Sequence, residues 1–462
     1  MKVRHSKATP SASGEGKAAG GHPSNGARHP GAKPQRKKPL PRIYYDSGGC
    51  GYYMRNARGG WVRTNESSVR RELKIAGYSA NVPEGKCVSP LDEALSAIQK
   101  TQDVAFAGPL AGYKAGLHSF DGRRALVTDS PRLIEPAQGD WPTLRALMEG
   151  LLKDGEHDQT PYLYGWLKIA VEALRAGHRR AGQALVLAGP PDCGKSRLQF
   201  LITIILGGRA ARPYRYMRSG SEFNAELFGA EHLVIEDEQP SNDLRARRNF
   251  GSRVKEMTVN DGVSCHGKGR QAISLEPFWR LSISLNDEPE NLMVLPPLDD
   301  SLAEKVILLR ASRRAMPMPT STPDEREAFM ARLRGELPAF VGWLLAWEIP
   351  AALASGRFGI THFHHPALVE ALSHLAPEMR LLQLVDAEIF RHGRRKPWEG
   401  TAADLETLLT REGSRCARDV RRLFHFANAC GTYLARLADK SAPQRVARHR
   451  SADARKWTIQ PT

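Results

Sequence analysis

The chain has 462 residues and a formal net charge of +17. This length is enough for two or three domains that each bury a core, which excludes a peptide or a bare linker. No apolar run reaches the roughly 18 to 20 residues that span a bilayer, and no secretory signal is visible, so we expect a cytoplasmic protein without a membrane partner. The six cysteines lack a CxxC pair, which argues against a disulfide framework or a zinc knuckle and favours reduced thiols.

The positive charge is concentrated at the two ends of the chain. Residues 1–42 carry ten Lys or Arg against one Glu, and residues 391–462 carry sixteen against seven acidic residues. Residues 1–41 contain almost no large apolar side chain, which predicts a disordered basic arm. Basic ends on a nearly neutral body favour a polyanionic partner, most simply nucleic acid, although a solubilising tail and a solvated helix face would also fit.

Residues 42–145 predict a small α+β domain. Aromatic residues alternate with turn residues over 43–63, which is typical of a β-hairpin or meander. Two short helices follow, and then a segment of strands and turns, over 66–77, 89–100 and 116–136. A primase site needs acidic residues paired on a strand, and this domain offers only the isolated Asp46. Priming is therefore expected of a separate primase.

Residues 146–350 predict an α/β domain with a mainly parallel sheet. Uniformly apolar runs, which suit strands buried on both faces, recur at 184–189, 232–237, 280–285 and 305–311. Helical segments, such as 196–206 and 243–257, separate these runs, as expected of strand–helix–strand units.

Residues 351–462 predict a helical C-terminal domain. It ends in one helix over 419–438, followed by short strands at 444–450 and 455–460. Arginines on the helix and this order of elements suit a winged-helix-like nucleic-acid-binding domain, although another small α+β domain would also fit.

The first apolar run leads into a glycine-rich motif that fits GxxxxGK[ST], the Walker A pattern of P-loop NTPases. Its residues are Gly189, Pro190, Pro191, Asp192, Cys193, Gly194, Lys195 and Ser196. The strand before it and the helix after it supply the context that the pattern requires. We expect backbone N–H groups and Lys195 to bind the phosphates of ATP and Ser196 to bind Mg²⁺. The alternative is a glycine-rich turn without a ligand.

Polar side chains end the next two apolar runs. Glu236, Asp237 and Glu238 close the run at 232–237, and Asn286 follows the run at 280–285. Asp237 is expected to position Mg²⁺, and Glu236 or Glu238 to orient the attacking water. Asn286 is expected to hydrogen-bond the γ-phosphate or its water. A solvated strand end and a turn-forming Asn are the simpler alternatives.

The order of these motifs from Gly189 to Asn286 resembles the superfamily III helicases of viruses, phages and other mobile elements, a branch of the AAA+ ATPases. Residues 362–382 and 457–459 look similar to phage-type primase-helicases. The resemblance implies a homo-oligomer, a hexameric ring, that hydrolyses ATP and moves along single-stranded or forked DNA during DNA replication.

The resemblance also implies a DNA-contacting hairpin and an arginine that reaches the γ-phosphate of a neighbouring subunit. The matching hairpin is 261–277, with DNA contacts from His266, Lys268 and Arg270, although it could be an ordinary exposed hairpin. The candidates for the arginine are Arg310, which is the first choice, Arg313 and Arg314. Lys305 stands where related sequences are expected to carry an arginine.

Two functions fit these features. The first is an ATP-hydrolysing DNA helicase or translocase that serves the replication of a phage or mobile genetic element. The second is an ATP-switched, DNA-binding replication initiator or regulator that does not unwind DNA. His362, His364 and His365 are metal-ligand types, but no carboxylate or cysteine neighbours them at ligand spacing in the sequence, which favours a turn that enters a helix.

Overall fold

The structure is a computed structural model that describes residues 39–238, 244–259, 262–269, 271–296, 298, 300–374, 376–391, 395–424, 426–450 and 454–461. It divides the chain into two units, Met1–Pro41 and Arg42–Thr462. Residues 1–38 of the predicted basic arm lie outside the described residues.

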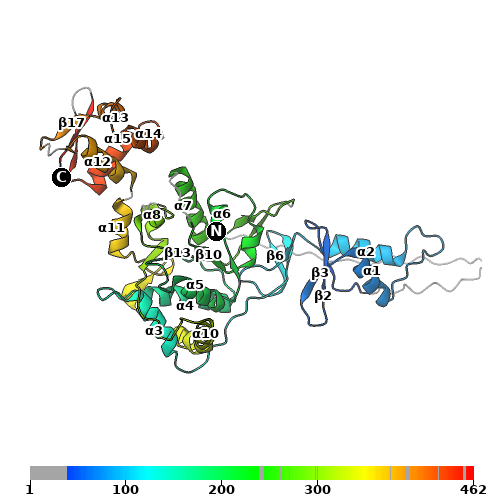
Figure 1. The fold of residues 1–462 in the computed structure, drawn as a ribbon. Coiled ribbons are helices and arrows are strands. Elements are labelled where there is room, and N and C mark those ends of the chain that lie inside the picture. The colour runs from blue at the N-terminus through cyan, green and yellow to red at the C-terminus, as the bar shows by residue number, and fades with distance from the viewer. Residues whose placement is uncertain are drawn as a thin grey trace, which may run out of the picture. The chain divides into compact units, whose positions relative to one another are not determined.

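The second unit begins with a four-stranded sheet of order β3-β2-β1-β4 against which two helices pack (Figure 1). These elements are β1 (Tyr44–Asp46), β2 (Gly51–Arg55), β3 (Trp61–Thr64), β4 (Asp103–Val104), α1 (Glu66–Ile75) and α2 (Pro90–Thr101). The side chains of Asn65 and Ser89 accept hydrogen bonds from backbone N–H groups of the first turn, which defines where each helix begins. The predicted meander and both predicted helices are present.

A three-stranded sheet of order β5-β7-β6 follows and joins the central core. Its strands are β5 (Phe106–Gly108), β6 (Gly116–Phe120) and β7 (Arg123–Val127). Leu110, Ala111 and Val127 are buried in the same hydrophobic cluster as the central sheet. The boundary expected between residues 145 and 146 falls inside α3 (Pro142–Leu152), so the packing is continuous there.

The central sheet has five strands in the order β14-β8-β13-β10-β9. They are β8 (Ala184–Ala188), β9 (Ala210–Ala211), β10 (His232–Glu236), β13 (Arg280–Leu285) and β14 (Val306–Arg310). All four pairings are parallel, and every residue of β8 and β13 is buried. The four apolar runs of the sequence are thus the four long strands, and the parallel α/β prediction is confirmed.

Helices cover both faces of this sheet. Alternate side chains of β8 point to opposite faces: Leu185 and Leu187 pack in one hydrophobic cluster, and Val186 packs in the other. The first cluster includes α3, α4 (Thr160–Ala176), α5 (Lys195–Ile205) and α10 (Pro323–Ala346). The second includes α6 (Tyr214–Met217), η1 (Ala225–Gly229), α7 (Leu244–Val259), α8 (Pro289–Leu292), α9 (Asp300–Ala303) and the hairpin strands β11 (Val263–Cys265) and β12 (Ile273–Leu275).

The segment after residue 350 still belongs to this core. It contains η2 (Ala351–Leu353), β15 (Ala354–Ser355), β16 (Gly359–Ile360) and α11 (Pro366–His374). Ile360 is fully buried in the first cluster, and His364 forms a parallel bridge with Leu308 of β14. The boundary expected between residues 350 and 351 therefore cuts through packed structure.

The C-terminal part has its own hydrophobic core and a three-stranded antiparallel sheet of order β17-β19-β18. Its elements are α12 (Pro377–Glu388), β17 (Trp398–Thr401), α13 (Ala402–Thr410), α14 (Ala417–Leu423), α15 (Ala429–Arg436), η4 (Leu437–Ser441), β18 (Val446–Arg450) and β19 (Arg455–Ile459). The prediction of one helix over 419–438 is wrong. Asn428 has a φ of 62°, which a continuous right-handed helix does not accommodate, so α14 and α15 are separate. No helix among the described residues is long and apolar enough to cross a membrane.

Candidate functional site

The glycine-rich loop connects the carboxyl end of β8 to the start of α5. Gly189 lies against Ala311, and a Cβ added to it would stand 2.2 Å from the carbonyl oxygen of Ala311, so only glycine fits. Gly194 has a φ of 110° and Asp192 a φ of 57°. The first value requires glycine, and the second is unusual for a residue with a side chain. The loop therefore adopts a tight backbone path that its sequence permits at both glycines.

Lys195 is buried, and its ammonium group points back into the loop. Nζ donates to the carbonyl oxygens of Gly189 and Pro190, each at 2.7 Å, and lies 3.8 Å from Sγ of Cys193. It also donates to Oδ1 of Asn286 at 3.3 Å. The structure thus brings together Lys195 and Asn286, which the sequence analysis identified in separate motifs.

The strand register places the acidic residues along the same edge of the sheet. Glu236 pairs with Ser284 of β13, and the next residue of β13, Leu285, pairs with Ala188 at the end of β8. Neighbouring strands are about 4.8 Å apart, so the backbone of Glu236 lies on the order of 10 Å from the start of the loop. The distance between the loop and Glu236 is enough for the phosphates of a nucleotide to fit between Lys195 and the acidic side chains.

The three acidic residues differ in their surroundings. Glu236 is half-buried and pairs weakly with Arg212 at 3.5 Å, whereas Asp237 is exposed. Asp237 has a φ of 47°, a conformation that is unusual for a residue with a side chain, directly after β10 ends at Glu236. Glu238 lies near Tyr214, whose pKa is raised chiefly by burial and in part by this carboxylate. The side chain of Asp237 is therefore open to solvent, whereas the side chain of Glu238 lies near Tyr214.

Two arginines, one at the end of β14 and one shortly after it, are held near the loop of their own chain. The backbone N–H of Arg310 donates to the side chain of Gln159 at 2.8 Å, and the Gln159 amide donates to the carbonyl of Arg310 at 2.9 Å. Arg313 donates to the carbonyl oxygen of Pro191 at 3.1 Å. Lys305 is different: it lies at the other end of β14, buried, with Nζ bonded to the carbonyl oxygen of Ser301 at 2.6 Å. Lys305 is therefore remote from the carboxyl edge of the sheet.

A buried polar network ties the helix after the loop to the strands that carry the acidic and amide side chains. Gln199 of α5 donates to the carbonyl of Ile235 at 3.3 Å and to Ser282 at 2.8 Å. His232 contacts Ser282 and Thr203, each at 2.7 Å. Burial lowers the pKa of His232 to about 3, so this ring is neutral. The network links α5 to both β10 and β13 directly beneath the row of polar residues.

The predicted hairpin is present as β11 and β12, and its apolar residues are rooted in the core. Lys268 is exposed at its turn, and His266 is half-buried against Phe223, with ring centroids 5.2 Å apart. Asn224 accepts from the backbone N–H of His266 at 2.7 Å and donates to the carbonyl of Ser264. Arg270 lies outside the described residues. The loop at 221–224 is thus part of the hairpin surface, with 44% of Phe223 exposed.

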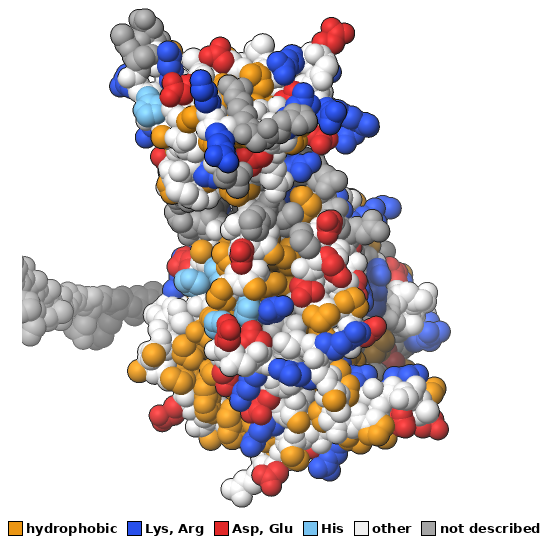
Figure 2. Space-filling model, turned by 60° about the vertical axis from the view of Figure 1, so that its left-hand side comes forward, with side chains coloured by type: hydrophobic (Ala, Val, Ile, Leu, Met, Phe, Trp, Pro, Cys, Tyr) orange, Lys and Arg blue, Asp and Glu red, His pale blue; other side chains and the backbone are white. Residues whose placement is uncertain are grey.

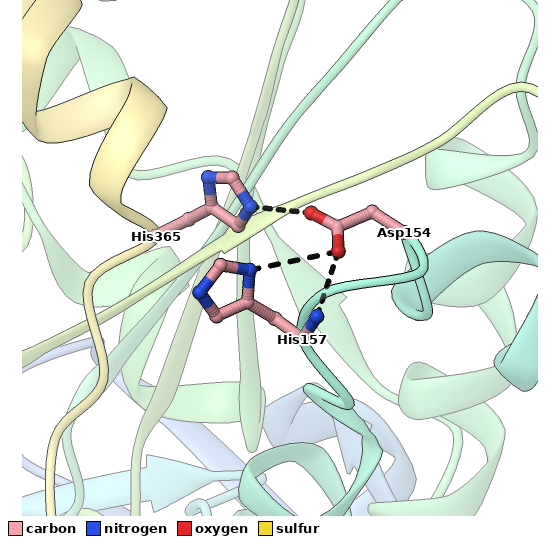
Figure 3. Close-up of side chains that lie close together, drawn as sticks. All are labelled: Asp154, His157 and His365. Carbon is pink, nitrogen blue, oxygen red and sulfur yellow. Dashed lines mark hydrogen bonds and ion pairs between the residues drawn. The ribbon is translucent and has the colours of Figure 1, made fainter.

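The histidine segment before α11 does enter a helix, but it also contacts a carboxylate. Nε2 of His365 lies 2.5 Å from Oδ2 of Asp154, and His157 approaches the other oxygen of the same carboxyl group at 3.6 Å (Figure 3). Burial alone would raise the pKa of Asp154, but hydrogen bonds from the His157 backbone and from His365 outweigh it and lower the pKa to about 2. No carboxylate neighbours these histidines along the sequence, but the fold brings Asp154 next to His365.

The surface charge is mixed on the face drawn in Figure 2, where Lys and Arg side chains are interspersed with Asp and Glu. In the C-terminal part several arginines are paired, among them Arg445 with Asp386 at 2.6 Å. The hairpin of β18 and β19 is more uniformly basic, with four exposed cations: Arg448, Arg450, Arg455 and Lys456. Part of the positive charge is thus balanced locally, in the hairpin as well, where Arg448 lies 3.9 Å from Asp439.

Sequence reasoning missed Gln159, Gln199 and Phe223. Gln199 lies one helical turn after Lys195, so its position beside the loop could have been read from the spacing in the helix. Gln159 and Phe223 belong to segments without a motif, and only the tertiary structure brings them to Arg310 and to the hairpin.

No protein-family model and no curated protein matches the chain. Among solved structures, an apo structure of the C-terminal region of NrS-1 covers 91% of this chain and 96% of that chain, with 12% sequence identity and a TM-score of 0.51. The A form apo structure of the same region gives 0.50 over the same shares. An X-ray structure of JCV helicase gives only 0.23, with 15% identity over 53% of this chain and 69% of that chain. The chain therefore shares its fold with the C-terminal region of NrS-1.

Proposed function

We propose that this protein is an ATP-hydrolysing DNA helicase or translocase of the superfamily III type that serves replication of a phage or mobile genetic element. The observation that carries the proposal is the position of Lys195, which donates to the loop carbonyls and to Asn286 at the carboxyl edge of a parallel sheet. Parallel α/β sheets bind ligands at this edge, and a glycine-rich loop before a helix favours phosphate.

The residues at the site fit ATP with Mg²⁺. The hydroxyl of Ser196 is exposed at the start of α5, and the carboxylate of Asp237 is exposed at the end of β10, so both are available to hold the ion. Oxygen ligands of this kind suit Mg²⁺, which would neutralise charge on the phosphate oxygens. Glu236 is the better candidate to orient the attacking water, because it is the last residue of β10 and is held in the sheet by its pairing with Ser284. Glu238 is the second candidate.

Asn286 and Gln199 couple the nucleotide to the rest of the domain. Asn286 shares Lys195 with the loop, and the lysine must exchange these bonds for phosphate oxygens when nucleotide binds. Gln199 joins α5 to β10 and β13, so a shift of the loop is transmitted to the strands that bear Glu236 and Asn286. Hydrolysis can then move the elements rooted in the same core, including the hairpin of β11 and β12.

Three surfaces are proposed to contact DNA. The hairpin offers Lys268 and, by sequence, Arg270, and the ring of Phe223 beside His266 provides a surface on which a base can stack. The C-terminal part has the order helix, strand, helices, strand and strand, which suits a winged helix with β18 and β19 as its wing. Its exposed cations and the basic arm would bind phosphates without reading sequence.

We further propose that the active form is a homo-oligomer, a hexameric ring, supported by a separate primase. Arg313 is engaged with the loop of its own chain, and the backbone of Arg310 is fixed beside that loop. The side chain of Arg310 is the candidate that reaches a neighbouring subunit, and Lys305 is too far from this edge to replace it. Sedimentation with a slowly hydrolysed ATP analogue is expected to reveal a ring, and a monomer under those conditions would contradict this proposal.

The first test is strand displacement from a forked duplex with ATP and Mg²⁺, together with ATP turnover with and without single-stranded DNA. Lys195→Ala is expected to lose both activities, whereas Lys114→Ala, which removes an exposed lysine, is expected to keep both. Turnover without displacement in the native protein would favour the ATP-switched initiator or regulator. No turnover in any assembly state would contradict the ATPase proposal itself.

A further inference from the structure

A cluster of two imidazoles and one carboxylate lies outside the nucleotide site (Figure 3). Asp154, His157 and His365 each place one potential ligand atom within 4.8 Å of the others. Asp154 and His157 belong to the connection between α3 and α4, and His365 directly precedes α11. In Figure 3 the rings of His157 and His365, which come from two different segments of the chain, both point toward the carboxyl group of Asp154. The cluster therefore joins two connections that are distant in sequence.

The carboxylate is oriented by the backbone. Oδ1 of Asp154 accepts from the N–H groups of Glu156 and His157, at 3.1 and 2.9 Å, which leaves Oδ2 directed at His365. His365 is buried, and its backbone N–H donates to the carbonyl of Leu308. Backbone bonds of this kind fix a ligand before an ion arrives, as outer-shell contacts do in metal sites.

Two buried ring nitrogens of the cluster, Nδ1 of His157 and Nδ1 of His365, have no hydrogen-bond partner among the described residues. Nδ1 of His157 faces the Asp154 carboxylate at 3.6 Å. Ligand atoms around a tetrahedral ion with bonds of about 2.0–2.1 Å are roughly 3.4 Å apart, so small side-chain movements would complete the geometry. His364 is not available, because its Nε2 contacts the carbonyl oxygens of Ala303 and Val306.

We propose that Asp154, His157 and His365 bind a divalent transition metal ion, with Zn²⁺ as the fitting chemistry and water as the fourth ligand. Two imidazoles with one carboxylate suit zinc, whereas Mg²⁺ and Ca²⁺ prefer oxygen ligands. The side chain of His157 is 31% exposed, so the cluster lies close to the surface. None of its three residues belongs to the candidate nucleotide site or to the proposed DNA-contacting surfaces.

The ion would join the connection at 153–159 to the segment before α11. This connection includes Gln159, whose side chain holds both backbone groups of Arg310. The segment before α11 pairs with β14 through Leu308 and His364. The metal site therefore supports the end of β14 from two sides and has a structural role.

The test uses the full chain, stripped of metal with a chelator and then titrated with Zn²⁺ by calorimetry. The native protein is expected to bind one equivalent that His157→Gln weakens by about tenfold or more. His157→Gln leaves the turn intact, because the backbone N–H of His157 makes the bond to Asp154. Asp154→Asn is the second variant, and His178→Gln, which changes an exposed histidine, is the matched control. Circular dichroism checks that each variant is folded.

X-ray absorption at the zinc edge identifies the ligands in the native protein without any substitution. Nitrogen and oxygen scatterers at about 2.0–2.2 Å, with no sulfur near 2.3 Å, are expected. Sulfur ligation would assign the ion to the free cysteines and overturn the proposal. Native-like zinc binding by a folded His157→Gln variant, or no zinc binding by the native chain, would reduce the cluster to a hydrogen-bonded Asp154–His365 pair and also overturn it.

Discussion

Nζ of Lys195 lies 3.3 Å from Oδ1 of Asn286, which connects the glycine-rich loop to the strand inserted between β8 and β10. The same ammonium group is bonded to two loop carbonyls. A phosphate that binds in the loop must compete for this lysine, and Asn286 is then released to hydrogen-bond the phosphate or its water. The pair is therefore placed to respond to whether nucleotide is bound.

Asn286→Ala is expected to lower the kcat of ATP hydrolysis by about tenfold or more while changing nucleotide affinity by less than about threefold. The reason is that Lys195 and the loop remain, whereas the amide that contacts the reacting end is lost. Steady-state ATPase kinetics and a fluorescent nucleotide titration measure the two quantities. Asn291→Ala, which removes an exposed amide bonded to Glu288, is the control. An unchanged kcat in Asn286→Ala would contradict the role.

Glu236→Gln is expected to abolish hydrolysis and keep nucleotide binding, because the amide cannot accept a proton from water at neutral pH. Asp237→Asn is expected instead to raise the Mg²⁺ concentration that half-maximal turnover requires, because a charged ligand of the ion is lost. Turnover measured against Mg²⁺ separates the two effects. Glu84→Gln changes an exposed acid outside the proposed sites and is expected to behave as the native protein. Normal turnover in Glu236→Gln would transfer the role to Glu238.

The strands and the loop of the core could be predicted because they depend on local sequence. The long strands are uniformly apolar runs, and the loop has glycines where its backbone requires them. The order of the strands could not be predicted, since nothing in the run at 280–285 says that it inserts between β8 and β10. The break in the C-terminal helix depends on backbone conformation, which leaves the helical region at Phe424 and is left-handed at Asn428.

The candidate site shows the same division. The loop and the residues that end each strand were visible as motifs, and the parallel sheet brings them to one edge. Asp154 and His365 are separated by 211 residues, so no spacing rule applied to the sequence connects them. Gln159 is likewise held against Arg310 only by tertiary packing, and a glutamine in a connection carries no signal of such a role.

Stability is expected to depend on pH through His232. Its folded pKa is about 3, whereas its ordinary value is 6.5, so the unfolded chain binds a proton that the folded chain does not. The contribution is fully present above pH 6.5 and is lost as the pH falls toward 3, by up to about 1.4 kcal/mol per pH unit. Urea unfolding from about pH 7.5 to about pH 5 measures this slope.

His232→Gln is expected to flatten that slope, because glutamine can still bond to Thr203 and Ser282 but does not titrate. His178→Gln replaces an exposed histidine and is expected to leave the slope unchanged. The stability that Asp154 contributes is lost only at lower pH, because folding lowers the pKa of this carboxyl group from 3.8 to about 2. Equal slopes for His232→Gln and the native protein above pH 5 would show that His232 is not the titrating group.

Lys268→Ala is expected to lose strand displacement while keeping ATP turnover without DNA. The reason is that this exposed lysine lies at the turn of the hairpin, which is a separate two-stranded sheet and is distant in sequence from the glycine-rich loop. The loss of one phosphate contact should also reduce the salt dependence of single-strand binding by about one unit of slope. Arg270→Ala is expected to act in the same way. Lys74→Ala, on the exposed face of α1, is the control. If Lys268→Ala loses duplex binding and displacement to the same extent, the hairpin only anchors DNA and does not move it, which would favour an initiator or regulator over a motor.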